Sequence, residues 1–382
     1  MSEHAAVIER IRRLVAIPSV SSTDPAHDQG NRGVVALLAQ WLDELGMAVE
    51  LMPLPHHPDK LNLVATAGAG EGGLVLAGHT DTVPWDEGRW SSDPFRLELR
   101  DGRAYGLGTS DMKAFFALVV GALEGIGLER LRAPVTVVAT ADEESTMAGA
   151  RALLRLGRPR ARCAVVGEPT GLRPVYAHKG ILMEAVEVVG RSGHSSDPAL
   201  GANAIEGMHA VIGALLALRA ELAEAHRDPA FRVAHPTLNL GRIEGGDSPN
   251  RICPRCELHF DLRLLPGMAV ETLRETIRRR AEAALAGSGL SLRMRPLIEG
   301  APAHRVDPAS ALVREAEALT GRRACTVGFA TEAPFYAALG METLVLGPGE
   351  IDQAHQPDEY LELAQIGPAV ALLQRLIARH CT

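Results

Sequence analysis

Short apolar runs alternate with helical segments along much of the chain, and this alternation is the strongest constraint on its fold. The expected strands are 74–77, 135–140, 163–166 and 343–346, and the expected helices are 112–126, 147–156 and 365–379. Strands that alternate with helices form a largely parallel sheet with helices on both faces. A chain of 382 residues is also too long for one ordinary core. We therefore predict an α/β fold with two domains.

The segment 179–296 interrupts this alternation with a different order of elements. Residues 181–189, 237–243, 252–264 and 290–294 have strand patterns, and 203–226 and 270–286 have apolar residues at helical spacing. The order βαββαβ is that of a ferredoxin-like unit. We expect residues 1–178 and 297–382 to form the larger domain, with residues 179–296 inserted as a smaller one.

Five loops that carry acids or histidines lie next to the strands and helices of the larger domain. Their residues are His79, Asp81, Asp111, Glu143, Glu144, Glu168 and His355. In an open parallel sheet, the loops at the carboxyl ends of the strands converge on one crevice. These residues are therefore expected to share one site, although they span positions 79 to 355.

The residue types in these loops suit zinc. Imidazole nitrogen and carboxylate oxygen are common zinc ligands, and no cysteine is required. Three carboxylates and two histidines can serve two metal ions, with one histidine for each; the residues are His79, Asp111, Glu144, Glu168 and His355. A two-metal site makes water nucleophilic near neutral pH and polarises a carbonyl group.

Asp81 and Glu143 are left for other roles. Residues two apart in an extended chain point the same way, so Asp81 could hold the second imidazole nitrogen of His79. Glu143 is adjacent to the proposed ligand Glu144, and neighbouring side chains diverge. Glu143 could therefore face the attacking water as the general base and later protonate the leaving amine.

Each of these short patterns also occurs without a metal site. A Glu–Glu pair at a helix start usually interacts with the helix dipole, an Asp before a helix is usually an N-cap, and Gly-Glu-Pro-Thr is usually a turn. A lone His-x-Asp is usually a surface or capping pair. If each pattern had only its ordinary structural role, there would be no reason for all five loops to occur in this order beside the strands and helices.

The strings GHTDTVP, YGLGTSDMK, ADEES, GEPT, SGHSS and AHQPDE resemble the dinuclear zinc deacylase and exopeptidase family. The resemblance covers residues 75 to 360. It implies that His79 and Glu168 bind one Zn²⁺, that Glu144 and His355 bind the other, and that Asp111 bridges them. It implies catalytic roles for Asp81 and Glu143, and a cis peptide bond after Asp111. Co²⁺ can substitute at such sites.

The resemblance also assigns a role to the inserted domain. Residues 179–296 match the family's lid and dimerisation domain, so we expect a homodimer. His194, in SGHSS, matches a histidine that reaches the partner subunit's active site and stabilises the oxyanion. The alternative for His194 is a structural role, in which its hydrogen bonds are satisfied within a turn.

Several strings, including GGDSPNRIC and LGPGEIDQAHQPDEYLE, most resemble the family members that remove the acetyl group from N2-acetyl-L-ornithine in arginine biosynthesis. The substrate's α-carboxylate would need a cation, and Arg251 (after Asn250) and Arg263 are the candidates. Glu332, in TEAPF, is a candidate for reading the side-chain ammonium. A sibling deacylase acting on N-acetyl-citrulline, another N-acyl amino acid or succinyl-diaminopimelate remains the alternative, because the same motifs would serve it.

Other classes of function fit the sequence less well. A net charge of −8 with scattered Lys and Arg indicates no nucleic-acid partner, and no apolar run approaches the ~20 residues that span a bilayer. Five irregularly spaced cysteines favour a reducing cytoplasm. The Gly-rich stretch 67–73 precedes a strand, which is the wrong context for a phosphate-binding loop. A catalytically silent relative should lack some of the seven positions above, and none is missing.

Overall fold

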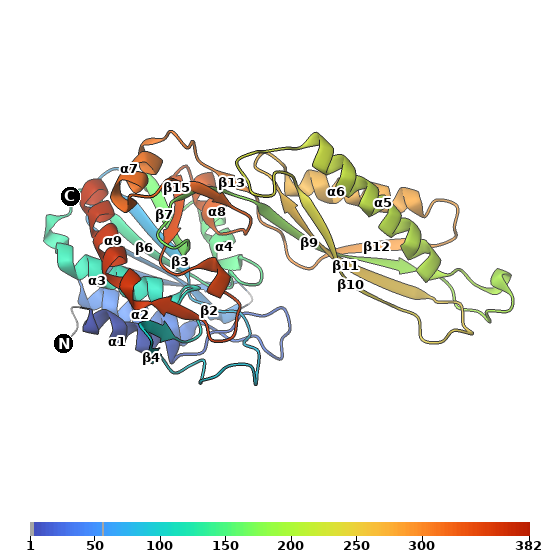
Figure 1. Cartoon of the computed structure of the whole chain (residues 1–382), viewed down its shortest axis with the longest axis horizontal. Helices are drawn as coiled ribbons and strands as arrows, with labels where there is room; N and C mark the ends of the chain where they lie inside the picture. Colours follow the sequence, from blue (N-terminus) through green and yellow to red (C-terminus); the bar gives the residue numbers. More distant parts are fainter. Residues whose placement is uncertain (1–3, 56) are drawn as a thin grey trace. The chain divides into compact units, whose positions relative to one another are not determined.

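The computed structural model describes residues 4–55 and 57–382, and the chain divides into two compact units. The first unit contains the described residues up to Tyr176, together with Val306–Cys325 and Thr331–Thr382. The second contains Ala177–Arg305 and Thr326–Ala330. The expected boundaries at 179 and 296 both fall inside the second unit. The units can be followed by colour in Figure 1.

A mostly parallel sheet forms the centre of the first unit, in the order β1-β2-β6-β3-β7-β15-β8. Its strands are β1 (Ala48–Leu54), β2 (His57–Ala67), β3 (Leu74–His79), β6 (Val135–Thr140), β7 (Cys163–Pro169), β8 (Val175–His178) and β15 (Glu342–Gly347). β6, β3, β7 and β15 run parallel to one another. All residues of β3, β6 and β7 are buried, as expected for parallel strands covered on both faces.

Two groups of helices cover this sheet (Figure 1). The first group comprises α1 (Ala5–Val15), α2 (Arg32–Glu44), α3 (Lys113–Ile126), α7 (Ala311–Thr320) and α9 (Ile366–Cys381). The second comprises α4 (Ala148–Leu156) and α8 (Ala333–Ala338). Helix α3 is apolar all round and is buried from Lys113 to Val120, since it packs against α1, α2 and α9 as well as β3. The predicted α/β class with helices on both faces is confirmed.

Short elements complete the first unit. A three-stranded sheet has the order β16-β5-β4 and consists of β4 (Glu98–Arg100), β5 (Arg103–Tyr105) and β16 (Tyr360–Glu362). β14 (Cys325–Val327), of which only Cys325 belongs to the first unit, pairs with β8. Single 3₁₀ turns are η1 (Leu128–Arg130), η3 (Ile351–Gln353) and η4 (Leu363–Gln365). The Gly-rich stretch connects β2 to β3 and therefore precedes a strand, as the sequence indicated.

The second unit contains an antiparallel sheet in the order β10-β11-β9-β12. Its elements are β9 (Gly180–Val189), η2 (Pro198–Leu200), α5 (Ala204–Ala225), β10 (Thr237–Gly245), β11 (Arg255–Leu264), α6 (Val270–Ala284), β12 (Ser291–Pro296) and β13 (His304–Arg305). The βαββαβ order and this strand order confirm a ferredoxin-like arrangement. Apolar residues of α5 and α6 pack with those of the sheet, and Cys253 and Cys256 lie in that core as free thiols.

None of the helices in the described residues is long and apolar enough to cross a membrane.

Candidate metal centre and active site

His79 is the last residue of β3, where the strand pairs with β6 and enters a loop. Its Nδ1 lies 3.0 Å from the backbone carbonyl oxygen of Asp81. A carbonyl oxygen can only accept, so Nδ1 must carry the proton in this hydrogen bond. Nε2 is therefore the nitrogen that a metal ion could use, and it lies 3.1 Å from Oδ1 of Asp111.

Asp111 lies between two histidines from distant parts of the chain. Its Oδ1 faces His79, and its Oδ2 lies 3.5 Å from Nε2 of His355. The peptide bond between Asp111 and Met112 is cis, as the family resemblance implied. One carboxylate that offers a separate oxygen to each histidine has the disposition expected of a bridging ligand.

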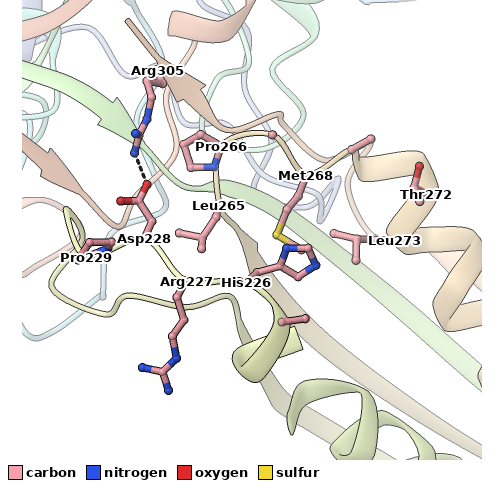
Figure 2. Close-up of a pocket in the computed structure, with 13 residues that line it drawn as sticks. His226, Arg227, Asp228, Pro229, Leu265, Pro266, Met268, Thr272, Leu273 and Arg305 are labelled. Carbon is pink, nitrogen blue, oxygen red and sulfur yellow. Dashed lines mark hydrogen bonds and ion pairs between the residues drawn. The ribbon is translucent and has the colours of Figure 1, made fainter. Parts of the chain in front are cut away.

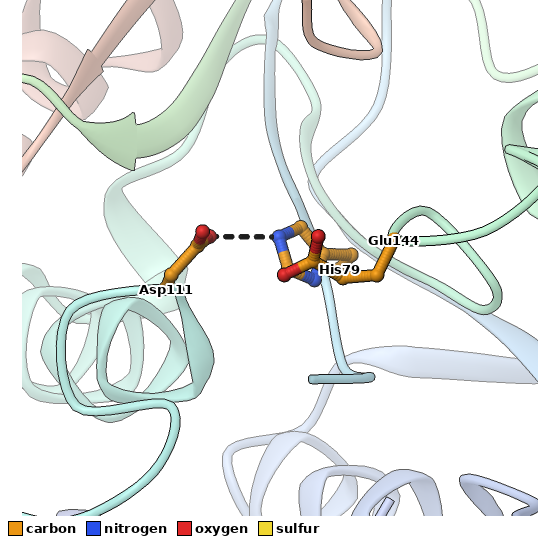
Figure 3. Close-up of side chains that lie close together, drawn as sticks. All are labelled: His79, Asp111 and Glu144. Atoms are coloured by element: carbon orange, nitrogen blue, oxygen red, sulfur yellow. Dashed lines mark hydrogen bonds and ion pairs between the residues drawn. The ribbon is translucent and has the colours of Figure 1, made fainter. Parts of the chain in front are cut away.

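The turn after β6 contributes Glu143 and Glu144. Nε2 of His355 lies 3.1 Å from Oε1 of Glu144, so these two side chains come together next to Asp111. His79, Asp111 and Glu144 each offer a ligand atom, and these atoms lie within 4.8 Å of one another (Figure 3). Glu168, in β7, has its Oε2 4.0 Å from Nε2 of His79.

The carboxylate of Asp81 differs from its expected position. Oδ1 of Asp81 is 3.7 Å from Nδ1 of His79, farther than the backbone oxygen of the same residue. The carboxylate instead accepts the backbone N–H groups of Glu143 (3.2 Å) and Glu144 (3.1 Å). Asp81 therefore orients His79 through its main chain and holds the Glu143–Glu144 turn through its side chain.

The site concentrates negative charge away from water. Asp81, Asp111, Glu143 and Glu168 are each at most 9% exposed. Burial and nearby carboxylates raise the pKa of Glu143 and of Glu168 well above the ordinary range. Hydrogen bonds with Asp111 and Glu144 raise the pKa of His355 to about 11.

These properties fit a metal centre. Buried carboxylates are costly unless protons or cations neutralise them. Metal ions can take that role at a set of nitrogen and oxygen ligands that zinc commonly uses. Nε2 of His79 lies close to Asp111 and Glu168, and Nε2 of His355 lies close to Asp111 and Glu144. The five predicted ligands would supply both positions.

Asp142, which directly precedes Glu143, was not singled out from the sequence. Its carboxylate accepts hydrogen bonds from Lys60, Ser21, Ser145 and Thr146. The residue has φ of 66°, in the left-handed region. Asp142 therefore anchors the turn that carries Glu143 and Glu144. Its position inside the ADEES string was the available signal, but its partner Lys60 is far away in sequence.

Glu332 lies in the same unit as the metal candidates and precedes α8. Its side chain is buried, with 1% of the residue exposed. Neither carboxylate oxygen has a hydrogen-bond partner among the described residues. Burial raises its pKa to about 7. Glu332 is thus a buried acid without a hydrogen bond of good geometry, although Thr140 and Tyr336 lie near enough to lower its pKa, and His79 and Asp81 also influence its charge.

The other predicted substrate-binding residues belong to the second unit. An isolated bridge pairs His194 with Arg251, and the backbone oxygen of Asn250 accepts from Ser195 N–H. Nδ1 of the exposed His194 is 2.7 Å from Oγ of Ser196. Thus His194, Asn250 and Arg251 lie in adjoining loops, where Arg251 forms an ion pair with Asp247.

Arg263 lies elsewhere in the second unit. It is near the carboxyl end of β11, whereas Arg251 precedes the other end of that strand. Eight residues at about 3.3 Å each place Arg255 and Arg263 roughly 26 Å apart. Arg263 forms a 3.1 Å ion pair with Asp261.

A cavity of about 690 Å³ lies entirely in the second unit (Figure 2). Leu265, Met268 and Leu273 supply apolar lining, and an ion pair joins Asp228 to Arg305 at its edge. None of the predicted site residues lines it.

Comparisons with known proteins identify relatives along the whole chain. It is 47% identical over 382 residues to the acetylornithine deacetylase of Pasteurella multocida, covering 100% of both chains. It is 50% identical over 370 residues to the acetylornithine deacetylase of Edwardsiella ictaluri, covering 97% of this chain and 96% of the relative.

The fold also matches solved structures. The YXEP protein of Bacillus subtilis, described as a dinuclear metal-binding peptidase, superimposes with a TM-score of 0.68 at 17% identity over 98% of each chain. Residues 75–379 match the sequence pattern of peptidase family M20/M25/M40. The match spans most of the chain and includes every predicted metal ligand, and the chain therefore belongs to peptidase family M20/M25/M40.

Proposed function

We propose that the chain is a metal-dependent amide hydrolase that removes the acetyl group from N2-acetyl-L-ornithine, giving L-ornithine and acetate. The chemistry rests on one observation: Asp111 offers one carboxylate oxygen to His79 and the other to His355, within a buried group of acids. The substrate rests on the relatives named acetylornithine deacetylase, which share about half of their residues with this chain.

Two Zn²⁺ ions per subunit are the proposed cofactors, and Co²⁺ is expected to substitute. His79 and Glu168 would hold one ion, Glu144 and His355 the other, and Asp111 would bridge them. The match to a dinuclear metal-binding peptidase supports this number. When bound, such ions lower the pKa of water and polarise the amide carbonyl.

The side chains of this site would manage the protons. Glu143 lies beside the proposed ligands, and its pKa is raised by burial, which suits a group that takes a proton and returns it. Glu143 would accept the proton of the attacking water and deliver it to the departing α-amine. Asp81 would keep Glu143 in place through the two backbone N–H groups that it holds.

Residues of the second unit would complete the active site. His194 would donate to the oxyanion, and it would act on the partner subunit's substrate. Asn250 and Arg251 adjoin His194, which favours Arg251 over Arg263 for the substrate carboxylate. Glu332 would receive the side-chain ammonium, which would supply the partner that its carboxylate lacks among the described residues.

A homodimer through the second unit, acting in the cytoplasm, completes the proposal. β10 is an edge strand, and its Ile243 is 56% exposed. Nearby on α5, Ile205 is 47% exposed and approaches Gly246. An exposed apolar edge is a ready template for pairing with a second copy. All five cysteines are free, in keeping with a reducing compartment.

The test is hydrolysis of N-acetyl-ornithine by the zinc-loaded protein, beside N-acetyl-citrulline and succinyl-diaminopimelate, each with and without a chelator. We expect acetyl-ornithine to have the highest kcat/KM and the chelator to abolish turnover. Preference for another acyl amino acid would reject the substrate assignment alone. Turnover that survives complete metal removal would reject the metal-dependent mechanism.

A further inference from the structure

The carboxylate of Glu359 accepts hydrogen bonds from three backbone N–H groups of the loop that carries Asp111. Oε1 accepts from Ser110 (2.7 Å) and Asp111 (2.9 Å), and Oε2 accepts from Gly108 (3.0 Å). Glu359 is 1% exposed. Among the described residues, no lysine, arginine or histidine forms an ion pair with it; backbone N–H groups are its hydrogen-bond donors, and the buried Lys113 interacts with it only electrostatically.

Further contacts tie the same two segments together. The backbone oxygen of Glu359 accepts from Gly106 N–H at 3.0 Å. The hydroxyl of Ser110 donates to the backbone oxygen of Tyr360 at 2.7 Å. β16 then pairs with β5 in register, with Tyr360 opposite Tyr105. The loop before Asp111 is therefore fastened along its length to the segment that follows His355.

This arrangement links two candidate ligands that come from distant parts of the sequence. Glu359 is four residues after His355 and is bonded directly to the backbone N–H of Asp111. Nε2 of His355 and Oδ2 of Asp111 are 3.5 Å apart. The separation of these ligands therefore depends on the contact between their two segments.

We infer that Glu359 is a positioning residue, which sets the spacing of Asp111 and His355 and thereby the affinity and geometry of the metal centre. The inference rests on the proposed function, since it requires a metal at these residues. It assigns Glu359 no contact with substrate. Groups that orient metal ligands from outside the ligand set commonly change metal affinity about 10- to 100-fold when replaced.

Two substitutions of Glu359 separate its hydrogen bonds from its bulk. In Glu359→Gln, the amide oxygen can still accept from Ser110 and Asp111, but the NH₂ group faces the N–H of Gly108. Glu359→Ala removes all three hydrogen bonds. Glu362→Gln is the matched control, because Glu362 is the last residue of β16, the strand that directly follows Glu359, and it pairs with Arg103 instead of the Asp111 loop.

The probes are Co²⁺ and Zn²⁺ alone, titrated into metal-free protein against a chromophoric chelator. We expect affinity to fall about 10-fold in Glu359→Gln and up to about 100-fold in Glu359→Ala, with no change in the control. The visible absorption of the Co²⁺-loaded protein should change in both Glu359 variants. With saturating metal, kcat should fall while KM for acetyl-ornithine stays near its wild-type value.

Circular dichroism and Tm of the metal-free proteins check the fold. If Glu359→Ala does not fold, the Gln variant decides the question. Wild-type affinity and an unchanged Co²⁺ spectrum in a folded Gln variant would overturn the inference, as would an equal loss in Glu362→Gln. A wild-type protein that binds no metal would instead reject the proposed function, and this result is obtained before any variant is measured.

Discussion

The role of Asp81 can be tested by Asp81→Asn, which keeps the shape of the side chain and the backbone oxygen that accepts from His79. The carboxylate of Asp81 accepts two N–H groups, from Glu143 and Glu144. Asparagine has one acceptor oxygen, so one hydrogen bond is lost and an NH₂ group faces an N–H group. The side chain of His79 should stay in place.

The expected loss follows from these contacts. A hydrogen bond to a charged group is worth about 1.5–3 kcal/mol. If that energy is lost from the placement of Glu143, kcat falls by roughly 10- to 150-fold, at about 1.4 kcal/mol per tenfold. The free energy of unfolding should change less. Burial raises the pKa of Asp81 from 3.8 to about 6, so removing this buried charge relieves roughly 3 kcal/mol near neutral pH.

The assay measures kcat for acetyl-ornithine, bound metal by elemental analysis, and Tm. Asp86→Asn is the control, because Asp86 lies farther along the same loop and pairs with Arg89 at the surface. Lower kcat with two metal equivalents and a nearly unchanged Tm would agree with the structure. A wild-type kcat in Asp81→Asn would refute it, because the turn would then keep Glu143 in place without the carboxylate of Asp81.

Three further substitutions probe the site and the fold. Glu143→Ala should keep its metal and lose about 10²- to 10⁴-fold in kcat; substantial remaining turnover, measured beside metal content, would exclude it as the general base. His355→Ala should bind about one metal equivalent less by elemental analysis, although His355 is half exposed. Burial lowers the pKa of His178 to about 3. Between about pH 6.5 and pH 3, His178 therefore binds a proton in the unfolded chain but not in the folded chain. Stability should be full above pH 6.5 and fall by up to about 1.4 kcal/mol per pH unit toward pH 3; urea unfolding of metal-free protein should show a shallower fall in His178→Gln, and equal slopes would contradict this assignment.

That the site residues lie close together could be predicted, because it follows from the parallel pairing of the strands that carry them. β6, β3 and β7 are neighbours, and their carboxyl ends lead to Glu143, His79 and Glu168. The apolar runs identify these strands, since strands buried on both faces carry continuous apolar residues. Loops at the carboxyl ends of such strands converge, which is why the sequence predicted a shared site.

The role of the Asp81 side chain could not be predicted in the same way. The expectation assumed that extended alternation continues from His79 to Asp81, but β3 ends at His79. The chain turns there, so the backbone oxygen of Asp81 faces the imidazole and the carboxylate faces the next loop. The end of the strand at His79, two residues before Asp81, was enough to exchange the two contacts.

The residues that hold these loops in place also could not be predicted from local sequence patterns. Asp142 depends on Lys60, and Glu359 depends on backbone N–H groups about 250 residues away. Backbone groups leave no mark in a sequence, so a carboxylate that binds only N–H groups resembles any other acid. The hairpin β1–β2 was also not predicted. Its first strand, β1, lies at the edge of the sheet and has mostly exposed residues, so it carries no continuous apolar run.

The strand geometry of the second unit bears on whether Arg251 or Arg263 is the better candidate for binding the substrate's α-carboxylate. Arg251 adjoins His194 through a β-bridge, whereas Arg263 lies near the opposite end of β11. Because the length of β11 separates them, the two arginines of one subunit cannot both bind the same carboxylate. A substrate whose reacting carbonyl contacts His194 has its α-carboxylate within a few bonds of that carbonyl. Of the two, Arg251 is the arginine of the same subunit that such a substrate can reach.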